Sequence, residues 1–212
     1  MSRHEHKGHG GHQHNHPHGD RHGARQPERF DPARAALLDD PARLEYLPPE
    51  RLIELLDAPA GVRVIDFGTG TGTIAIELAR RRPDLQVIAL DEQPQMLDLL
   101  KARPAARELR NLKPVLTGDM ALAQSAERVL AINVLHELGD KALEDLAGML
   151  KQGGSALVVD WNSEAARPVG PPRDHVYNPA EARRRLESAG LSVRESAPLR
   201  YHYVFVAAKP SK

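Results

Sequence analysis

Cysteine is absent from the 212 residues, and aromatic residues make up only 4% of them. Without cysteine the chain can form neither disulfide bonds nor thiolate metal sites. So few aromatic residues argue against a base-stacking surface for nucleic acid. The 29 basic and 29 acidic residues leave no net charge, so bulk charge favours neither nucleic acid nor an anionic membrane as a partner.

Long apolar segments are also missing. No apolar run approaches the roughly 18 residues that a membrane-spanning helix needs. The N-terminus lacks the apolar core of a signal peptide. These absences favour a soluble, cytoplasmic protein without a membrane or nucleic-acid partner. The length suits one α/β domain with a sizeable core.

The first 22 residues differ in composition from the rest of the chain, because eight of the 11 histidines lie there. Since this composition offers no apolar core, we predict a disordered His-rich tail over residues 1–29 and a folded domain over residues 30–212. Imidazoles at this density are typical of Ni²⁺ or Zn²⁺ binding, although a solubilising tail or an engineered tag is an alternative. The candidate metal ligands are His4, His6, His9, His12, His14, His16, His18 and His22.

One continuous segment carries the strongest pattern in the chain. Residues 62–66 suit a buried strand, and apolar residues recur at helical spacing over residues 74–79. Between them stand Gly68, Gly70 and Gly72, which allow a sharp turn and leave the main chain open to a ligand. The N-terminus of the helix offers unpaired N–H groups to an electronegative ligand. The segment therefore predicts a nucleotide or nucleoside site.

Two acidic residues indicate which kind of nucleotide or nucleoside the segment would bind. A phosphate-binding P-loop would need a lysine after the glycines, and none is present. Residues 70–75 formally match the G-x-G-x-x-A dinucleotide pattern, so a nicotinamide-dependent oxidoreductase stays an alternative. Asp66, at the end of the first strand, would repel a pyrophosphate but suits an ammonium group. Asp91 ends the next apolar run, where a ribose-binding acid is typical.

On these residues the chain resembles the class I S-adenosylmethionine-dependent methyltransferases. The resemblance covers roughly residues 45–208, with the DxGxGxG motif at 66–72 and a Gly-Asp-Met step at 118–120. Residues 131–138 and 150–161 fit the fourth and fifth strands of that family. Within the family the chain looks closest to small-molecule methyltransferases similar to ubiquinone and menaquinone C-methyltransferases. It departs from them because it lacks their Leu-Pro-Phe-Pro-Asp-like loop before the fourth strand.

The resemblance implies a doubly wound, Rossmann-like α/β fold. Its seven-stranded sheet would be mostly parallel, with an antiparallel terminal strand and helices on both faces. The pattern along the chain agrees, since strand and helix segments alternate as in βαβ units. Further strands are expected at 86–90, 113–116, 128–133, 155–160, 191–195 and 201–206, and further helices at 31–38, 40–47, 48–56, 94–102, 140–150 and 178–190.

The resemblance also implies S-adenosylmethionine as the cofactor. Asp66 would contact the methionine ammonium, Asp91 the two ribose hydroxyls, and Asp119 the adenine amino group. Met120 would lie behind the adenine ring, and Asn133 beside the sulfur. The full set of expected cofactor contacts is Asp66, Gly68, Thr69, Gly70, Gly72, Asp91, Glu92, Gly118, Asp119, Met120 and Asn133.

The candidate catalytic residues are His136, His175 and Tyr177. His136 follows the fourth strand, where open α/β sheets bind ligands, and its imidazole could take a proton from an acceptor. A structural role beneath the loop is the alternative. The loop 167–177 could close over a substrate with His175 or Tyr177 as a base and Arg173 pairing an anionic group, or it could be a connector.

The resemblance implies that the helices over about residues 30–60 cap the substrate side of the sheet, and plain packing against the sheet is the alternative. Arg34, Arg43 and Tyr46 are the candidate substrate contacts among them. Trp161, the only tryptophan, is expected to pack a pocket wall.

We therefore predict a methyltransferase that acts on a small-molecule acceptor. Methyl transfer from a sulfonium needs alignment and exclusion of water more than a strong catalytic dyad. The Asn-Pro-Pro-Tyr signature of amino-group methylation is absent after the fourth strand, where residues 133–136 read Asn-Val-Leu-His. The first alternative to a methyltransferase is a metal-binding or metal-responsive protein with a nucleoside-binding domain, and the second is the nicotinamide-dependent oxidoreductase. The oligomeric state stays open, with a homodimer as one alternative.

Overall fold

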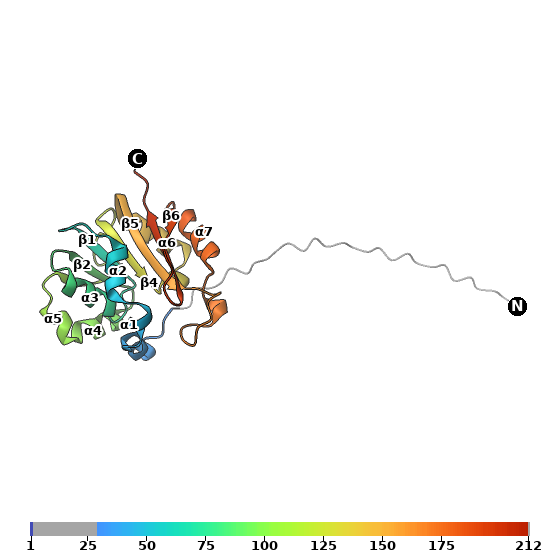
Figure 1. Ribbon diagram of the computed structural model, residues 1–212, viewed down its shortest axis with the longest axis horizontal. Helices are drawn as coiled ribbons and strands as arrows, with labels where there is room; N and C mark the ends of the chain where they lie inside the picture. The colour runs from blue at the N-terminus through green and yellow to red at the C-terminus, as the bar shows by residue number, and fades with distance from the viewer. Residues whose placement is uncertain (2–28, 212) are drawn as a thin grey trace.

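The computed structural model describes Met1 and residues 29–211. Seven strands form one sheet in the order β3-β2-β1-β4-β5-β7-β6 (Figure 1). The strands are β1 (Arg63–Phe67), β2 (Gln86–Asp91), β3 (Leu112–Leu116), β4 (Ala126–Ile132), β5 (Leu150–Trp161), β6 (Ser192–Glu195) and β7 (His202–Ala208).

The sheet is parallel except at one strand. β1 pairs in parallel with β2 and β4, while β7 runs antiparallel to both of its neighbours, β5 and β6. The prediction of a mostly parallel, seven-stranded sheet with an antiparallel terminal strand is confirmed. From β1 the chain builds outward to β3 and then returns to add β4 on the other side of β1. Such a reversal opens a ligand-binding crevice at the carboxyl ends of the strands.

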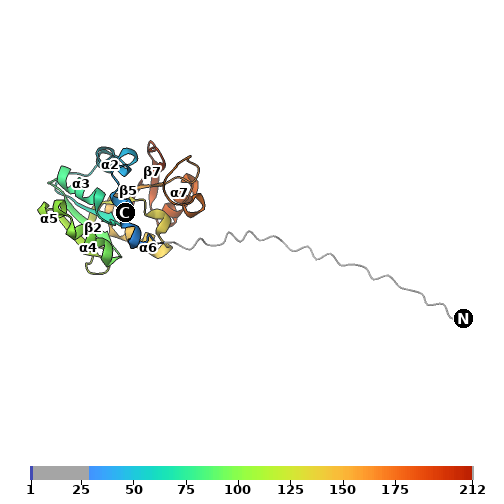
Figure 2. The same cartoon turned by 90° about the horizontal axis from the view of Figure 1, so that it is seen from below.

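Helices cover both faces of the sheet, and Figure 2 shows α2 and α6 on opposite sides of β5. One core cluster joins the sheet to α2, α3 and α4, and a second joins it to α6 and α7. Successive strand residues point to opposite faces, so Val64 packs in the first cluster and Ile65 in the second. The helices on these faces are α2 (Pro49–Leu56), α3 (Thr73–Arg81), α4 (Pro94–Ala102), α6 (Asp140–Met149) and α7 (Pro179–Ser188).

The segment before β1 differs from the two helices expected over residues 31–47. It forms the 3-10 helix η1 (Pro32–Asp39) and a four-residue helix α1 (Arg43–Tyr46). Asp31 caps η1 as expected, since its Oδ1 accepts the Ala33 N–H at 2.9 Å. Asp40 precedes a proline, which disfavours helical backbone, and its ψ of 118° ends η1. A short helix α5 (Pro104–Glu108) was not predicted.

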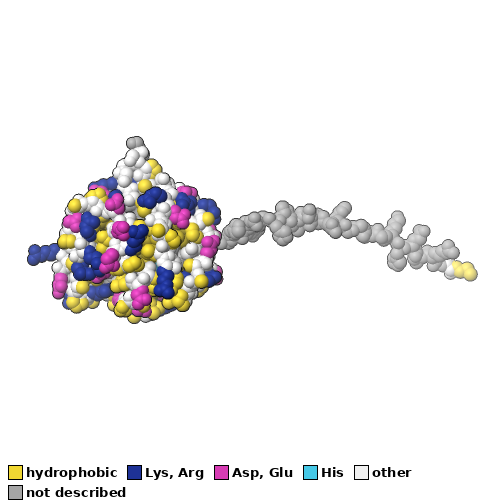
Figure 3. Space-filling view, viewed as in Figure 1, with side chains coloured by type: hydrophobic (Ala, Val, Ile, Leu, Met, Phe, Trp, Pro, Cys, Tyr) yellow, Lys and Arg dark blue, Asp and Glu magenta, His cyan; other side chains and the backbone are white. Residues whose placement is uncertain are grey.

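The surface and the helix lengths add two observations. None of the helices in the described part of the chain combines the length and apolar character needed to cross a bilayer. Figure 3 shows basic and acidic side chains interspersed over the visible face, without a continuous patch of either sign.

Candidate active site

The turn between β1 and α3 contains the three expected glycines. Gly68, Gly70 and Gly72 have φ angles of 70°, 57° and 78°, a left-handed backbone that other residues rarely adopt. A Cβ atom at Gly68 would lie 2.5 Å from a Val134 methyl group, and one at Gly72 would lie 2.2 Å from a Leu100 methyl group. Turn geometry and packing therefore already require these glycines, and their contact with a cofactor stays a prediction.

Asp66 lies at the carboxyl end of β1 and is only 3% exposed. Burial raises the pKa of its carboxyl group to about 6, although a hydrogen bond from the Thr69 hydroxyl at 2.7 Å opposes the rise. A carboxylate removed from water in this way gains from pairing with a cation. Thr69 thus contacts Asp66 and orients it at the site.

Asp91 lies at the end of β2, next to the glycine turn. Its Oδ2 accepts the Gly70 N–H at 2.8 Å, and its Oδ1 accepts the Gln93 N–H at 2.9 Å. Burial raises the pKa of Asp91, and these backbone hydrogen bonds oppose the rise. Each carboxylate oxygen keeps a second lone pair, so the group can still accept two ribose hydroxyls. The next residue, Glu92, points elsewhere, since it pairs with Arg29 at 2.7 Å and its side chain is 49% exposed.

The turn after β3 lies beside Asp91, because the Thr117 N–H donates to the Asp91 carbonyl oxygen at 2.9 Å. Gly118 has a φ of 97° and open space where a Cβ would lie. Asp119 is exposed, and Met120 packs partly buried against the core. The structure therefore brings the expected adenine contacts to the same edge as Asp91.

Asn133 directly follows β4 and has a φ of 56°. Its N–H donates to the Val159 carbonyl oxygen at 2.8 Å, which fixes the backbone. Its Oδ1 is buried and has no hydrogen-bond partner within the described residues. Strained backbone and an unpaired buried acceptor both cost free energy and are typical of functional sites.

His136 forms the most extensive polar contact on the substrate side. It lies in η2 (Leu135–Glu137), and its Nδ1 lies 2.8 Å from Oδ1 of Asp160, a fully buried residue of β5. The Asp160 carboxylate also accepts the backbone N–H groups of His136 and Trp161. Burial alone would lower the pKa of His136, but the charge of Asp160, its hydrogen bond and the charge of Glu137 together outweigh burial and raise it. The imidazole is therefore held in place and favours its protonated form.

Residues 29–39 lie across the carboxyl edge of the sheet. The Phe30 N–H donates to Glu137 Oε2 at 3.1 Å, and the Phe30 carbonyl oxygen accepts a hydrogen bond from the Gln93 side chain at 3.0 Å. Burial raises the pKa of Glu137 to about 7. The segment thus joins the end of β2 to η2, over the crevice.

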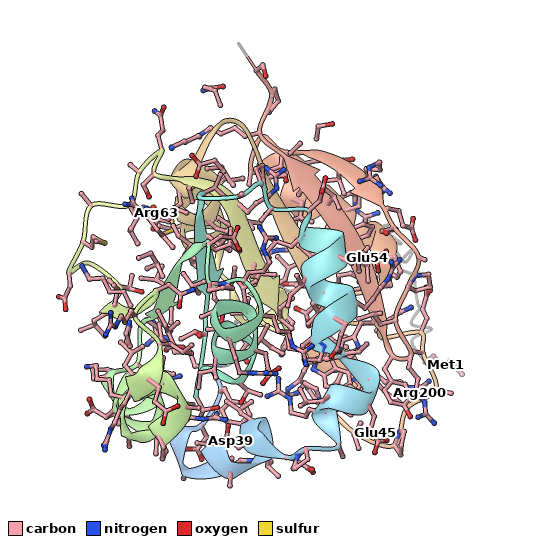
Figure 4. All side chains as sticks on the ribbon, turned by 60° about the vertical axis from the view of Figure 1, so that its left-hand side comes forward. Met1, Asp39, Glu45, Glu54, Arg63 and Arg200 are labelled. Carbon is pink, nitrogen blue, oxygen red and sulfur yellow. The ribbon has the colours of Figure 1, made fainter. Side chains whose placement is uncertain are left out.

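Asp39, at the end of η1, links residues 29–39 to the glycine turn through hydrogen bonds. Its Oδ1 accepts hydrogen bonds from the hydroxyls of Thr71 and Thr73 at 2.6 and 2.8 Å, and pairs with Arg103 at 2.7 Å. Figure 4 shows Asp39 at one end of the molecule and Arg63, the first residue of β1, at the other.

His202 is a site residue that the sequence did not reveal. It begins β7, is 1% exposed, and its ring centroid lies 4.2 Å from that of Trp161. Neither ring nitrogen has a hydrogen-bond partner in the part of the chain that the structure describes. Burial lowers the pKa of His202 to about 4. A Tyr-His-Tyr run at 201–203, in a chain with so few aromatic residues, was the one available signal.

The two other catalytic candidates lie in different surroundings. His175 is exposed in η3 (Arg173–His175). The Tyr177 hydroxyl accepts a hydrogen bond from Arg185 at 3.0 Å, and that guanidinium also lies over the tyrosine ring. Tyr177 is thus packed toward α7, whereas His136 is paired with Asp160. The catalytic roles of all three residues stay predictions.

The tail histidines from His4 to His22 lie outside the described residues. Within residues 29–211, no group of three or more histidine or acidic side chains is placed to hold a metal ion.

The chain is similar to known proteins over this same region. A family described as "Methyltransferase domain" matches residues 64–154, from β1 to the start of β5. A solved structure of a SAM dependent methyltransferase from Aquifex aeolicus is 29% identical, with a TM-score of 0.78. It aligns with 85% of this chain and over 100% of its own length.

Two curated proteins match shorter stretches. The release factor glutamine methyltransferase of Escherichia coli (strain K12) is 33% identical over 42% of this chain and 31% of its own length. The magnesium-protoporphyrin O-methyltransferase of Rhodobacter capsulatus is 46% identical over 33% of this chain and 30% of its own length. The chain spans about a third of the length of these relatives.

Proposed function

We propose that the chain, which matches a methyltransferase domain family over residues 64–154, is a class I S-adenosylmethionine-dependent methyltransferase that methylates a small-molecule acceptor at the carboxyl edge of its sheet. One observation carries the proposal: two buried carboxylates, Asp66 and Asp91, flank the glycine turn at the ends of β1 and β2. Such a pair suits a ligand that carries an ammonium group and a ribose, and it does not suit a pyrophosphate.

The surrounding residues fit S-adenosylmethionine. Burial raises the pKa of Asp66, and the ammonium of the cofactor would supply a positive charge that favours its ionised form. Asp91 would accept hydrogen bonds from the ribose hydroxyls, and the unpaired Oδ1 of Asn133 would accept a hydrogen bond from the amino-acid portion. Gly118, with open space beside it, would leave room for the adenine next to Asp119.

The bound cofactor supplies a methyl group on a sulfonium, which is a good leaving group. The protein therefore has to orient the acceptor and exclude water. His136, held by Asp160, favours the imidazolium form and would donate a hydrogen bond to an electron-rich acceptor. Glu137, whose burial raises its pKa to about 7, would take up the proton that the acceptor loses near neutral pH. Residues 29–39 would close over the bound cofactor and keep water out.

A small acceptor agrees with the residues after β4. One relative is named for a release factor glutamine and another for magnesium-protoporphyrin. The Asn-Pro-Pro-Tyr signature of glutamine methylation is replaced here by Asn133-Val-Leu-His136. A small-molecule acceptor is therefore the better proposal.

The alternatives have gained no support from residues 29–211. No observation there favours a nicotinamide cofactor, and the metal-binding prediction concerns the tail. If the tail binds Ni²⁺ or Zn²⁺ as an accessory, methyl transfer should persist after metal chelation and after deletion of residues 1–22. A cytoplasmic location stays a prediction.

Calorimetric titration of the full-length chain tests the proposal. S-adenosylmethionine and S-adenosylhomocysteine are expected to bind with micromolar affinity, and NADH is expected not to bind. Asp91→Ala should abolish binding of both sulfur nucleosides, whereas Asp84→Ala, which removes a surface ion pair with Arg82, should bind them normally. Binding of NADH alone, or of none of the three, would overturn the methyltransferase proposal.

A further inference from the structure

Four aromatic rings gather beside the His136–Asp160 pair, and we call them the aromatic cluster: Tyr46, Trp161, Tyr201 and His202. The Tyr46 ring centroid lies 5.7 Å from Trp161, 5.6 Å from Tyr201 and 5.9 Å from His202. Trp161 and Tyr201 belong to a small third cluster, and Tyr46 packs both against it and against the core that includes α2. The sheet register places Trp161 opposite His202 and Asp160 opposite Tyr203. The aromatic cluster therefore lies directly beside the His136–Asp160 pair.

His202 brings an unsatisfied polar group into this cluster. Buried polar side chains are nearly always hydrogen-bonded, and an unpaired one costs about 1–3 kcal/mol. Both nitrogens of His202 lack a partner within residues 29–211. Since its burial lowers the pKa to about 4, the ring is neutral at neutral pH and offers one acceptor nitrogen. A ligand with an O–H or N–H group would supply the missing partner.

Arg167 adds a positive charge to the same place. Its guanidinium carbon lies 5.1 Å from the centre of the Trp161 ring. The two Nη atoms donate to the carbonyl oxygens of Val169 and Pro171, and its buried Nε has no partner among the described residues. Burial lowers the pKa of Arg167, as expected for a charge held by neutral carbonyls. An anionic group on a ligand would complete this environment.

We propose that the aromatic cluster binds the methyl acceptor, and that the acceptor is a planar aromatic acid carrying a hydroxyl or N–H group. Its ring stacks on Trp161, its acidic group pairs with Arg167, and its O–H or N–H donates to His202. The inference rests on the proposed function, because only a methyltransferase makes the bound molecule a methyl acceptor. It goes further by naming the class of acceptor.

Tyr46 governs access to His202. It is half-buried on the short helix α1, and its ring lies nearly parallel to the imidazole, at 19°. Figure 4 shows Glu45 of α1 and Arg200, which lies just before β7, at the same corner of the molecule. The acceptor would take the space beside Trp161 and His202 that the Tyr46 ring fills. Removing the Tyr46 ring should therefore tighten acceptor binding.

Fluorescence of Trp161 tests the proposal directly, because this residue is the only tryptophan in the chain. The probe is 4-hydroxybenzoate, which has the ring, the acid and the hydroxyl. Three analogues each lack one feature: benzoate the hydroxyl, 4-hydroxybenzamide the charge, and trans-4-hydroxycyclohexanecarboxylate the aromatic ring. We expect saturable quenching by 4-hydroxybenzoate and about tenfold weaker binding of each analogue, or about 1.4 kcal/mol. Equal binding of all four, or no change in emission, would overturn the proposal.

Matched variants assign each feature to its residue. His202→Phe keeps the stacked ring but loses the acceptor nitrogen, so it should bind 4-hydroxybenzoate and benzoate equally, while His202→Gln should restore the preference. Arg167→Met should bind 4-hydroxybenzoate and 4-hydroxybenzamide equally. Tyr46→Ala should bind 4-hydroxybenzoate several-fold more tightly. A variant that is merely destabilised would weaken all probes alike, and that result would contradict the assigned contacts.

Calorimetry with S-adenosylmethionine on the same full-length protein separates the two proposals. If the cofactor binds and no probe does, the acceptor inference fails and the methyltransferase proposal stands. If the probes bind and the cofactor does not, the cluster is a binding site of another kind, and both proposals fail.

Discussion

The two halves of the carboxyl edge of the sheet are built in different ways. Around β1 and β2, main-chain turns and two strand-end acids, Asp66 and Asp91, form the proposed cofactor half. Around β4, β5 and β7, the side chains of His136, Asp160 and His202 form the proposed acceptor half. The first half depends on backbone geometry, which tolerates little variation. The second depends on side chains, which can change from one enzyme to another and so select the acceptor.

The largest expected effect falls on the cofactor half. Asp66→Asn removes the carboxylate proposed to pair with the ammonium of S-adenosylmethionine while keeping the size of the side chain. Charged hydrogen bonds are worth about 1.5–3 kcal/mol each, so calorimetry should show affinity falling about 100-fold. Methylthioadenosine, which lacks the amino-acid group, should bind the variant and the parent equally. A matching loss for methylthioadenosine would place Asp66 in a purely structural role.

The same carboxylate predicts how cofactor binding depends on pH. The pKa of Asp66 is about 6 in the free protein, and pairing with an ammonium requires the ionised form. Below about pH 6, affinity for S-adenosylmethionine should therefore fall about tenfold per pH unit. Calorimetry between about pH 5 and pH 7.5 checks this, and the dependence should vanish in Asp66→Asn.

A smaller effect is expected in the acceptor half, from Asp160→Asn. Breaking a buried ion pair by changing one partner costs about 3 kcal/mol in the free energy of unfolding. NMR titration should also show a lower pKa for His136 than in the parent protein, because the charge and hydrogen bond of Asp160 no longer oppose the effect of burial. Asp140→Asn, at an exposed position on α6, should change neither quantity. An unchanged His136 pKa would show that Asp160 does not control its charge.

A still smaller effect concerns the segment that spans both halves. The folded-state pKa of Glu137, about 7, lies above its ordinary value of 4.5. Folding therefore favours the protonated form, and stability present below about pH 4.5 is lost as the pH rises through about 7. Glu137→Gln should remove this loss and raise the free energy of unfolding at about pH 8 by on the order of 2 kcal/mol. Urea denaturation at about pH 5 and pH 8 measures it.

The control for that experiment is Glu144→Gln, at an exposed position on α6. Its free energy of unfolding should equal that of the parent protein at both pH values. If the free energy of unfolding of Glu137→Gln also equalled that of the parent protein at both pH values, ionisation of Glu137 would not destabilise the fold. That result would contradict the effect expected from its burial.

The smallest effect is expected for Asp39→Ala. Its side chain is 42% exposed, so its contacts with Thr71, Thr73 and Arg103 are screened by water and worth less than about 1 kcal/mol. Dissociation of S-adenosylmethionine, followed by stopped-flow fluorescence, should become about threefold faster. Asp40→Ala is the matched control, because within residues 29–211 its carboxylate accepts the N–H of Ala42 and no hydrogen bond from the glycine turn. Equal rates in both variants would show that η1 does not hold the cofactor.

The cofactor half could be predicted because its signals are local. Asp66 and the glycines lie in one segment, and Asp91 ends the next strand. Since parallel strands end at the same edge of a sheet, strand periodicity was enough to bring both acids together. What could not be predicted is that packing against Val134 and Leu100 also requires Gly68 and Gly72.

The acceptor half was predicted only in part. The position of His136 at the sheet edge followed from the end of β4, but its partner Asp160 depends on how β4 and β5 pair. His202 could not be predicted as part of the site, because the role of a histidine in a strand depends on the residues that surround it in the folded chain. Those neighbours, Trp161 and Tyr46, come from β5 and α1.

The sequence by itself determined the class of fold and predicted the kind of cofactor, because strand periodicity, glycine spacing and strand-end acids are properties of short segments. Only the tertiary structure decided the charge on His136, the burial of Glu137 under Phe30 and the unpaired state of His202. Charge and hydrogen bonding depend on distance and on exclusion of water. Both arise only when segments far apart in the chain pack together.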